Sequence, residues 1–203
     1  SVLDSLGDAE TVQFVATRNG RQDARELSPT ERRFEPVHYR PIPFRQDGLA
    51  QHGIPLDGEW RVHPEPVDSP CPEPLGGAGW RPFRVPGQFV QQGFDFPQDR
   101  PVAVAREFVV PRSWRERRVF LRFEAIHAGT RYWLNGRYLG QSENLFTPVE
   151  WELTPHVRFG EANRLDLEMT VDTVSEQLSH SCGYAFHNLG GIDRSVHLFA
   201  LPG

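Results

Sequence analysis

Lysine is absent from this 203-residue chain, and all 22 of its basic residues are arginine. Together with 27 acidic residues they give a formal net charge of −5 at pH 7. Proteins that bind nucleic acid through its phosphates carry a basic patch or a basic overall balance. The charge balance therefore argues against a broad nucleic-acid footprint, and we predict no nucleic-acid partner.

Long hydrophobic runs are also missing. No apolar stretch approaches the ~20 residues of a membrane-spanning helix, so we predict no membrane partner. The first ten residues, SVLDSLGDAE, lack the basic start and apolar centre of a signal peptide. The two cysteines, Cys71 and Cys182, are too few to indicate a redox compartment. We expect a soluble protein, and its localisation, cytoplasmic or secreted, stays open.

Convincing helical segments are lacking too, and the second half of the chain consists of short alternating segments. Val119, Leu121 and Phe123 alternate with charged residues in 117–125, and 164–171 repeats the pattern. Such alternation predicts antiparallel strands with one buried face. Further short strands are expected at 102–110, 130–135, 147–153 and 195–201. Together they predict an all-β fold, an antiparallel β-sandwich or jelly roll.

Prolines separate this half from what precedes it. Residues 36–97 hold 12 of the 18 prolines. Proline removes a ladder donor and fixes φ, so only short strands are expected here, at 55–64 and 79–87.

The first fifty residues are polar and weakly periodic. They contain one candidate strand at 10–16 and a loose, badly capped helix at 21–33. We therefore divide the chain into an extension, residues 1–50, which wraps onto the core or is partly mobile, and a β-sandwich domain, residues 51–203.

The stretch RYWLNGRYLG, residues 131–140, predicts a tight hairpin. Asn135-Gly136 fits a type I′ turn, because both central positions require φ > 0. We expect this hairpin to set strand register. Its aromatic residues Tyr132, Trp133 and Tyr138 are more often packing residues than platforms for sugars.

Several motifs stand in a characteristic order between about Leu56 and Pro202. They are LDGEW (56–60), VPGQFVQQGFDFP (85–97), the strand-to-hairpin segment 105–154, GEANRLDLEMTV (160–171) and FHNLGGIDRSVHL (186–198). In this order they resemble the N-terminal sugar-binding domain of family 2 glycoside hydrolases, the group with β-galactosidases, β-glucuronidases and β-mannosidases. The resemblance implies a galactose-binding-domain-like jelly roll, a carbohydrate ligand, and a parent enzyme that hydrolyses O-glycosyl bonds.

The same resemblance places the catalytic residues elsewhere. Such enzymes are retaining glycosidases, whose two carboxylates lie about 5 Å apart. In the family both are glutamates of a later (β/α)₈ barrel, one of them in an Asn-Glu pair, and no Asn-Glu dipeptide occurs here. The glutamates of the alternating segments are expected on solvated sheet faces: Glu107, Glu124, Glu150, Glu152 and Glu168. We expect no catalytic residue and no hydrolysis by this chain alone, with the parent's C-terminal immunoglobulin-like and barrel domains as partners.

Candidate sugar contacts follow from the resemblance. Gln88 matches an asparagine of the β-galactosidases and keeps an amide, which can donate to one hydroxyl and accept from another. Phe89 replaces a tryptophan, Asp95 matches an aspartate, and Asn188 matches the closing segment. Ala185 stands where the family places an aspartate that holds substrate, and a methyl group cannot accept a hydroxyl bond. The identity of the sugar therefore stays open.

Two alternatives stand beside this hypothesis. An independent carbohydrate-binding module would stack exposed rings on a sugar, and Phe89, Phe94 and Phe96 cluster in one loop. A scaffold domain with lapsed sugar binding is favoured by Ala185. We expect Arg194 to be an internal ion-pair partner in either case.

Cofactor motifs are weak. His180, Cys182 and His187 would be three metal ligands without a defined fourth. The run GGAG (76–79) is not followed by a helix that could hold a phosphate. We predict no cofactor and no metal.

Overall fold

The computed structural model of the chain forms two compact units, Ser1–Pro36 and Val37–Gly203. It describes residues 12–18, 21–27, 53–63, 73–97, 99–143, 145–180 and 190–203. The boundary predicted at residue 50 lies outside the described residues.

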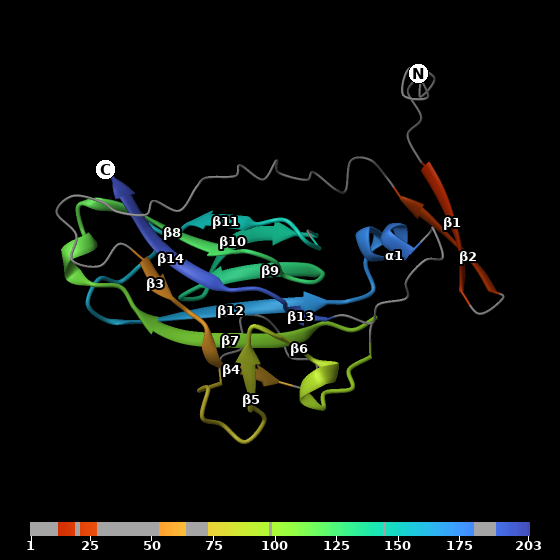
Figure 1. The fold of residues 1–203 in the computed structure, drawn as a ribbon, viewed down its shortest axis with the longest axis horizontal. Helices are drawn as coiled ribbons and strands as arrows, with labels where there is room; N and C mark the ends of the chain where they lie inside the picture. The colour runs from red at the N-terminus through yellow and green to blue at the C-terminus, as the bar shows by residue number, and fades with distance from the viewer. Residues whose placement is uncertain are drawn as a thin grey trace, which may run out of the picture. The chain divides into compact units, whose positions relative to one another are not determined.

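The first unit contains a pair of antiparallel strands, β1 (Val12–Arg18) and β2 (Arg21–Leu27) (Figure 1). The strand expected at 10–16 is confirmed by β1. The helix expected at 21–33 is wrong, since its first seven residues form β2. Pairing along β1 gives the inward backbone groups of β2 hydrogen-bond partners, whereas a badly capped helix would leave the groups at its ends open.

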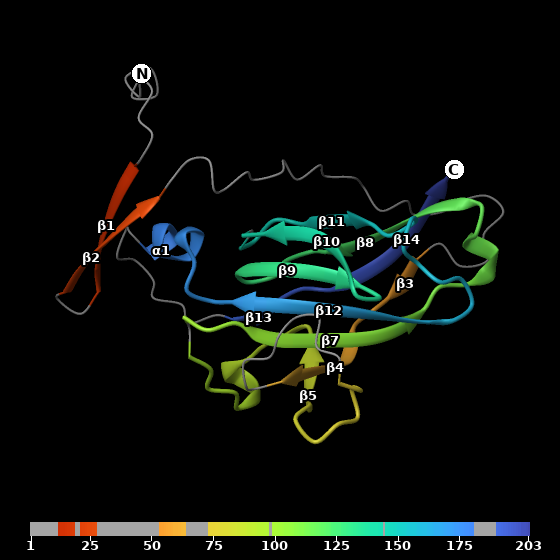
Figure 2. The same cartoon turned by 180° about the vertical axis from the view of Figure 1, so that it is seen from behind.

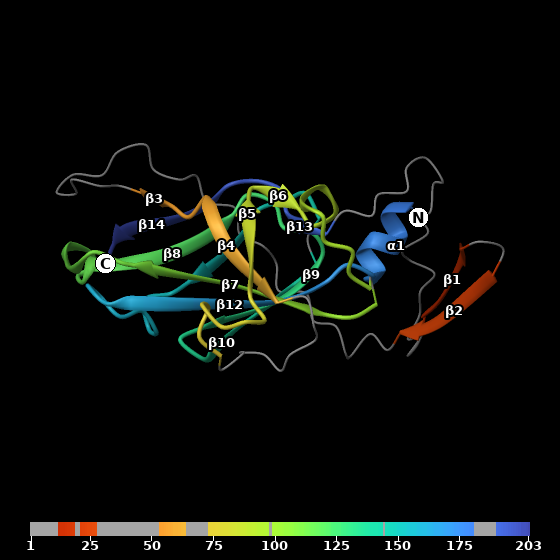
Figure 3. The same ribbon diagram turned by 90° about the horizontal axis from the view of Figure 1, so that it is seen from below.

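The second unit is a sandwich of two antiparallel sheets (Figures 1, 2 and 3). The six-stranded sheet has the order β10-β9-β12-β7-β4-β5, and the four-stranded sheet the order β11-β8-β14-β3. The strands are β3 (Gly53–Pro55), β4 (Gly58–His63), β5 (Arg81–Val85), β7 (Val102–Val109), β8 (Arg117–Phe123), β9 (Gly129–Leu134), β10 (Arg137–Ser142), β11 (Val149–Glu152), β12 (Ala162–Thr170) and β14 (Val196–Pro202). The all-β jelly-roll prediction is confirmed.

Shorter elements join these strands. The described residues also form a two-stranded pair of β6 (Gly87–Gln88) with β13 (Gly191–Ile192), two 3-10 turns (Val90–Gln92 and Arg112–Trp114) and one short helix, α1 (Val174–His180). No helix in the described ranges is long and apolar enough to cross a membrane.

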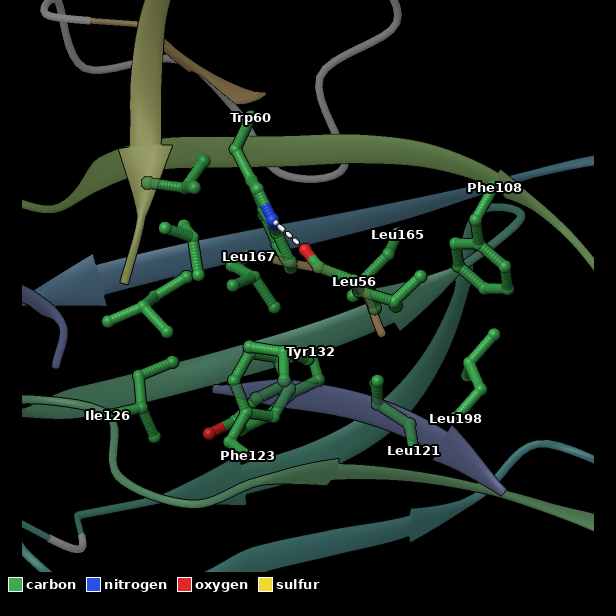
Figure 4. Close-up of a cluster of buried hydrophobic side chains, with 14 of the residues drawn as sticks. Leu56, Trp60, Phe108, Leu121, Phe123, Ile126, Tyr132, Leu165, Leu167 and Leu198 are labelled. Atoms are coloured by element: carbon green, nitrogen blue, oxygen red, sulfur yellow. Dashed lines mark hydrogen bonds between the residues drawn. The ribbon is translucent and has the colours of Figure 1, made fainter. Parts of the chain in front are cut away.

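The alternating residues form the core between the sheets. Val119, Leu121 and Phe123 of β8 face Leu165 and Leu167 of β12, and all five are fully buried. Figure 4 shows this packing around Trp60, whose indole N–H donates to the Leu56 carbonyl at 2.7 Å. The predicted inward faces are therefore correct.

A second, smaller cluster lies on the outer face of the six-stranded sheet. The loop that contains the GGAG run brings Trp80 over Ala103 and Ala105 of β7. The guanidinium of Arg164 lies 5.6 Å from the Trp80 ring centre and pairs with Asp166. Burial raises the pKa of Asp166, and the hydrogen bond from Arg164 opposes that rise. The glycine-rich run therefore belongs to a packing loop.

The predicted hairpin joins β9 and β10. Leu134 pairs with Arg137, and the two residues between them have positive φ, 51° at Asn135 and 80° at Gly136. The two-residue turn is thus confirmed. Tyr132 is buried under the hairpin, and Tyr138 is 53% exposed.

The side chain of Asn135 ties this turn to the start of β12. Its Nδ2 donates to the His156 carbonyl at 3.0 Å and to Asn163 Oδ1 at 2.9 Å, and its Oδ1 accepts from the Arg164 N–H. The fully buried Asn163 in turn exchanges two hydrogen bonds with the backbone of Arg158, at 2.7 and 2.8 Å. Both amides are therefore satisfied as donors and as acceptors.

Candidate functional site

The loop at residues 85–97 lies on a floor of phenylalanine rings. Phe89 and Phe94 are 2% and 4% exposed, and Phe83 of β5 lies 5.0 Å from Phe89 between ring centres. Phe96, which is partly buried, contacts both Phe89 and Phe94 at 5.1 and 5.4 Å. The rings of Phe89 and Phe94 face the protein, so in this structure they support the loop from below.

A glutamine clamp fixes the outer part of this loop. The Gln92 side chain accepts from the Arg84 N–H at 2.7 Å and donates to the Arg84 carbonyl at 2.8 Å. The amide thus occupies the place of a neighbouring strand along the free edge of β5. A shallow depression of about 430 Å³ lies beside it, lined by Gly58, Glu59, Pro82, Phe83, Arg84 and Gln92. The Gln92 amide at this depression is already hydrogen-bonded to the Arg84 backbone, which favours a structural role for it.

The inner part of the loop holds Gln88 in a short ladder. Gln88 pairs with Gly191 across β6 and β13, and the Phe89 N–H donates to the Gly190 carbonyl at 2.8 Å. His127 pairs with the other side of Gly191, with N–H to oxygen distances of 2.9 and 3.0 Å. The main chain at Gly191 is therefore held from both sides, by Gln88 and by His127.

Gly191 is required at this crossing. Its φ is 146°, and a Cβ there would lie 2.4 Å from the Gly87 carbonyl oxygen and 2.9 Å from Gln88 Cα. Real contacts of a Cβ are not that short, so any side chain would push β6 away. The absence of a side chain lets β6 and β13 approach closely.

Asp193, two residues after Gly191, adds a carboxylate near Gln88, Gly191 and His127. Burial raises the pKa of Asp193, while a hydrogen bond with the Gln88 side chain and the charge of Arg194 oppose that rise. Its Oδ1 is buried and has no hydrogen-bond donor in the part of the chain that the structure describes. Asp193 was not predicted from the sequence, because a residue after a two-residue strand shows no periodic pattern.

The other predicted contacts are placed differently. Asp95 is exposed on the same loop, and Asn188 and Ala185 lie outside the described residues. Arg194 was expected to be an internal ion-pair partner. This expectation is wrong, because Arg194 is exposed, and its positive charge acts to lower the pKa of the neighbouring Asp193, against the effect of burial.

The glutamates form ion pairs with arginines on the sheet faces. Arg122, whose side chain is 3% exposed, lies 2.7 Å from Glu124 and 3.1 Å from Glu150. Glu168 pairs with Arg131 at 3.0 Å, and Arg118 pairs with Glu152. The prediction of a solvated face is wrong for Glu150, whose side chain is 7% exposed, since Arg122 replaces water as its partner.

No group of three potential metal ligands occurs within the described ranges. Of the metal ligands considered from the sequence, Cys182 and His187 lie outside those ranges.

The chain is similar to one group of known proteins, both by a family model and by individual relatives. The family model for the sugar binding domain of glycosyl hydrolases family 2 matches residues 94–202. A β-galactosidase of Halalkalibacterium halodurans is 27% identical over 175 residues, which cover 72% of this chain and 17% of the relative. A β-glucuronidase of Formosa agariphila is 33% identical over 67 residues, which cover 33% of this chain and 7% of the relative.

Solved structures resemble the fold. A β-glucuronidase from an uncultured Clostridium sp. superposes with a TM-score of 0.65 at 23% identity, over 79% of this chain and 31% of that one. The chain thus spans a minor part of the proteins that it matches. The range matched by the family model begins at Phe94, so Gln88 precedes it.

Proposed function

Because the chain belongs to the glycosyl hydrolases family 2 sugar-binding domains, we propose that it binds carbohydrate at the end of the sandwich where Gln88 and Asp193 meet. The observation that carries this proposal is the backbone of Gln88, fixed opposite Gly191, two residues before Asp193, whose buried Oδ1 has no hydrogen-bond donor among the described residues. An amide next to a carboxylate offers both donors and acceptors, which suits a ligand rich in hydroxyl groups.

The remaining loop residues have different parts in this proposal. Phe89 and Phe94 hold the loop from below, and Phe96 is partly accessible at its side. Asp95 is exposed on the loop and stays a predicted contact, as does Asn188. Sugar recognition would then depend more on polar groups than on stacking.

Within a longer enzyme, the chain would form one wall of the substrate site. Its relatives are named β-galactosidases and β-glucuronidases, and it spans 17% of the first of them. We propose that hydrolysis belongs to further domains of such a parent, immunoglobulin-like and barrel domains among them. Glu124 and Glu150 share one buried arginine, which supports a structural role for both of them.

A self-sufficient carbohydrate-binding module is less well supported. Such a module presents exposed rings on one surface, and the Phe89 and Phe94 rings are covered. The exposed ring of Tyr138 lies 5.4 Å from that of Trp133, on the hairpin of β9 and β10. This pair is one place where a stacking module would find an exposed ring, and Phe146, which is 55% exposed, is another.

The test is a titration of the isotope-labelled chain with galactose, glucuronate, mannose and short β-linked oligosaccharides, followed by NMR. We expect saturable shifts at Gln88 and Asp193 that Gln88→Ala abolishes. Gln141→Ala, which removes an exposed glutamine from β10, is the matched control and should bind as the unaltered chain does. Shifts that saturate at Trp133 and Tyr138 instead would favour the stacking module, and no saturation up to millimolar sugar would contradict a site on this chain.

A further inference from the structure

We infer that Phe146 stacks on a second sugar unit, next to the unit that Gln88 binds, so that the ligand is a short oligosaccharide rather than a single sugar. This inference rests on the proposed function, because it names the substrate class of the same site. The rings considered from the sequence as sugar platforms belong to the loop at residues 85–97. Phe146 lies on a different loop, and it is 55% exposed.

The loop that contains Phe146 crosses from one sheet to the other. It follows β10, whose last residue, Ser142, pairs with Thr130 in the first part of β9. It leads to β11, whose first residue, Val149, pairs with Phe123 at the end of β8. The crossing therefore takes place at the end of the sandwich where β9 begins. Figures 1 and 2 show β6 and β13 at this same end.

His127 connects Phe146 with the Gln88 site. The ring centres of Phe146 and His127 are 5.8 Å apart, with 67° between the ring planes. The backbone of His127 exchanges hydrogen bonds with that of Gly191 at 2.9 and 3.0 Å, and Gly191 also pairs with Gln88. Neighbouring strands lie about 4.8 Å apart, so about 10 Å separates the main chains of His127 and Gln88. Phe146 thus packs on the backbone ladder that holds Gln88.

The contact with His127 leaves a face of the Phe146 ring available. Two rings at 67° meet edge to face, so His127 covers at most one of the two faces of Phe146. The exposed fraction of 55% agrees with a ring that is open to solvent. His127 is 1% exposed, so Phe146 has a packed side chain as its support. An open ring face on a fixed support suits stacking against the C–H surface of a sugar.

Other rings are less suitable for this role. Phe89 and Phe94 are 2% and 4% exposed and support the loop at residues 85–97. Tyr138 is 53% exposed, but it is on the hairpin at the opposite end of β9. The six residues of β9 span roughly 17 Å as an extended strand. Among the described aromatic residues that are more than half exposed, Phe146 is the one at the Gln88 end of β9.

The separation between the two contacts indicates the size of the ligand. The main chains of His127 and Gln88 are about two strand spacings, or about 10 Å, apart, and Phe146 lies on the side chain of His127. This separation exceeds the width of a single sugar ring. Gln88 and Phe146 would therefore contact successive units, one through its hydroxyl groups and the other through its C–H surface.

The experiment compares a β-linked disaccharide, cellobiose or lactose, with its component monosaccharides, by NMR titration of the full chain. Phe146→Ala should weaken disaccharide binding by roughly fivefold, about the effect of one aromatic contact, and change monosaccharide binding by less than about twofold. Phe146→Trp keeps a ring and should restore disaccharide binding. Disaccharide binding that Phe146→Ala leaves unchanged would overturn the inference.

Val109→Ala is the matched control. Val109 is also an exposed apolar side chain, at 53%, and it pairs with Ala162 at the start of β12, away from Gln88. This variant should bind the disaccharide as the unaltered chain does. An equal loss from Val109→Ala and Phe146→Ala would mean that the effect is not specific to the ring, and the inference would be wrong.

An exposed ring can also pack against another protein chain, and the same spectra detect this. Signals of Phe146 that shift with protein concentration and do not respond to any sugar would place the ring between two copies of the chain. That result would refute a stacking role.

The two hypotheses can fail separately. Monosaccharide binding that Gln88→Ala removes, together with disaccharide binding that ignores Phe146→Ala, would support the proposed function and refute the inference. Disaccharide binding that Phe146→Ala weakens and Gln88→Ala leaves intact would support stacking and contradict the proposed site at Gln88. No saturation by any sugar would contradict both.

Discussion

The polar side chains near the two ends of strand β9 differ in how fully they are hydrogen-bonded within the protein. After the strand, the amides of Asn135 and Asn163 have every donor and acceptor paired within the protein. Before the strand, His127 leads to Gly191 and the Gln88–Asp193 pair, where a buried carboxylate oxygen has no donor among the described residues.

This contrast separates stability from recognition within one scaffold. A closed network such as that of Asn163 stabilises the fold and has nothing left to offer a ligand. An open group such as that of Asp193 contributes little to stability but can interact with an incoming hydroxyl. Variants at the Asn163 end should therefore change the stability of the fold, and variants at the Asp193 end should change ligand binding.

The largest effect is expected from Asn163→Ala. It deletes the bonds to Arg158 and to Asn135 and leaves buried backbone groups unpaired, so the free energy of unfolding should fall by about 3 kcal/mol. Urea unfolding would measure this loss. The exposed variant Gln141→Ala should stay within about 0.5 kcal/mol of the unaltered chain. A loss below about 1 kcal/mol for Asn163→Ala would mean that the network is not the stabilising end.

Gly191→Ala should combine both kinds of effect. The Cβ would collide with the Gly87 carbonyl oxygen, and φ of 146° is unfavourable for alanine, so we expect a loss of about 2 kcal/mol. Because β6 must move, sugar binding at Gln88 should also be lost. Calorimetric unfolding and the NMR titration would measure the two effects.

Gly136→Ala is the control at the other end of β9. It also has positive φ, at 80°, but a Cβ there would meet nothing within 4 Å. It should cost about 1 kcal/mol through φ alone and leave sugar binding unchanged. Equal effects on binding from both glycine variants would remove the distinction between the two ends.

Sequence reasoning succeeds where a period or a turn rule applies. The alternation of Leu165, Leu167 and Met169 correctly predicts the inward face of β12, and Asn135-Gly136 correctly predicts its turn. These signals are local, because each depends on neighbours within a few residues.

The candidate site contains no comparable signal. Gln88 and Gly191 are about a hundred residues apart and meet in strands of two residues, which are too short to show alternation. The burial of Phe89 and Phe94 also depends on the way the loop folds, which aromatic clustering alone does not reveal. The pairing of Glu150 with Arg122 follows from the register of β11 against β8. The pattern of neighbouring residues in the sequence does not reveal this register.

The smallest effect on stability is expected from Asp193→Asn. Its pH dependence is also the most direct test of the contrast between the two ends of β9. Burial raises the pKa of Asp193 in the folded state, so the folded state holds this proton more tightly than the unfolded state does. Stability from this group is therefore greatest at low pH and falls as pH rises from the ordinary aspartate range through the raised pKa. Above that range the burial of the charge is a cost, which Asp193→Asn removes.

At pH 7 the Asp193→Asn chain should thus be as stable as the unaltered chain or slightly more stable. The gain should be less than about 1 kcal/mol, because solvent screens a carboxylate that is only partly buried. It should shrink as pH falls below the folded pKa, and urea unfolding between pH 4 and pH 7 would follow it, at about 0.5-unit steps.

Asp166→Asn is the matched comparison. Burial also raises the pKa of Asp166, but its carboxylate pairs with Arg164, so its removal leaves that arginine without its partner. This variant should lose stability at pH 7, opposite in sign to Asp193→Asn. If Asp193→Asn instead loses as much stability as Asp166→Asn, then Asp193 is a structural carboxylate with a partner of its own, and the end of the sandwich at Gln88 is as closed as the end at Asn163.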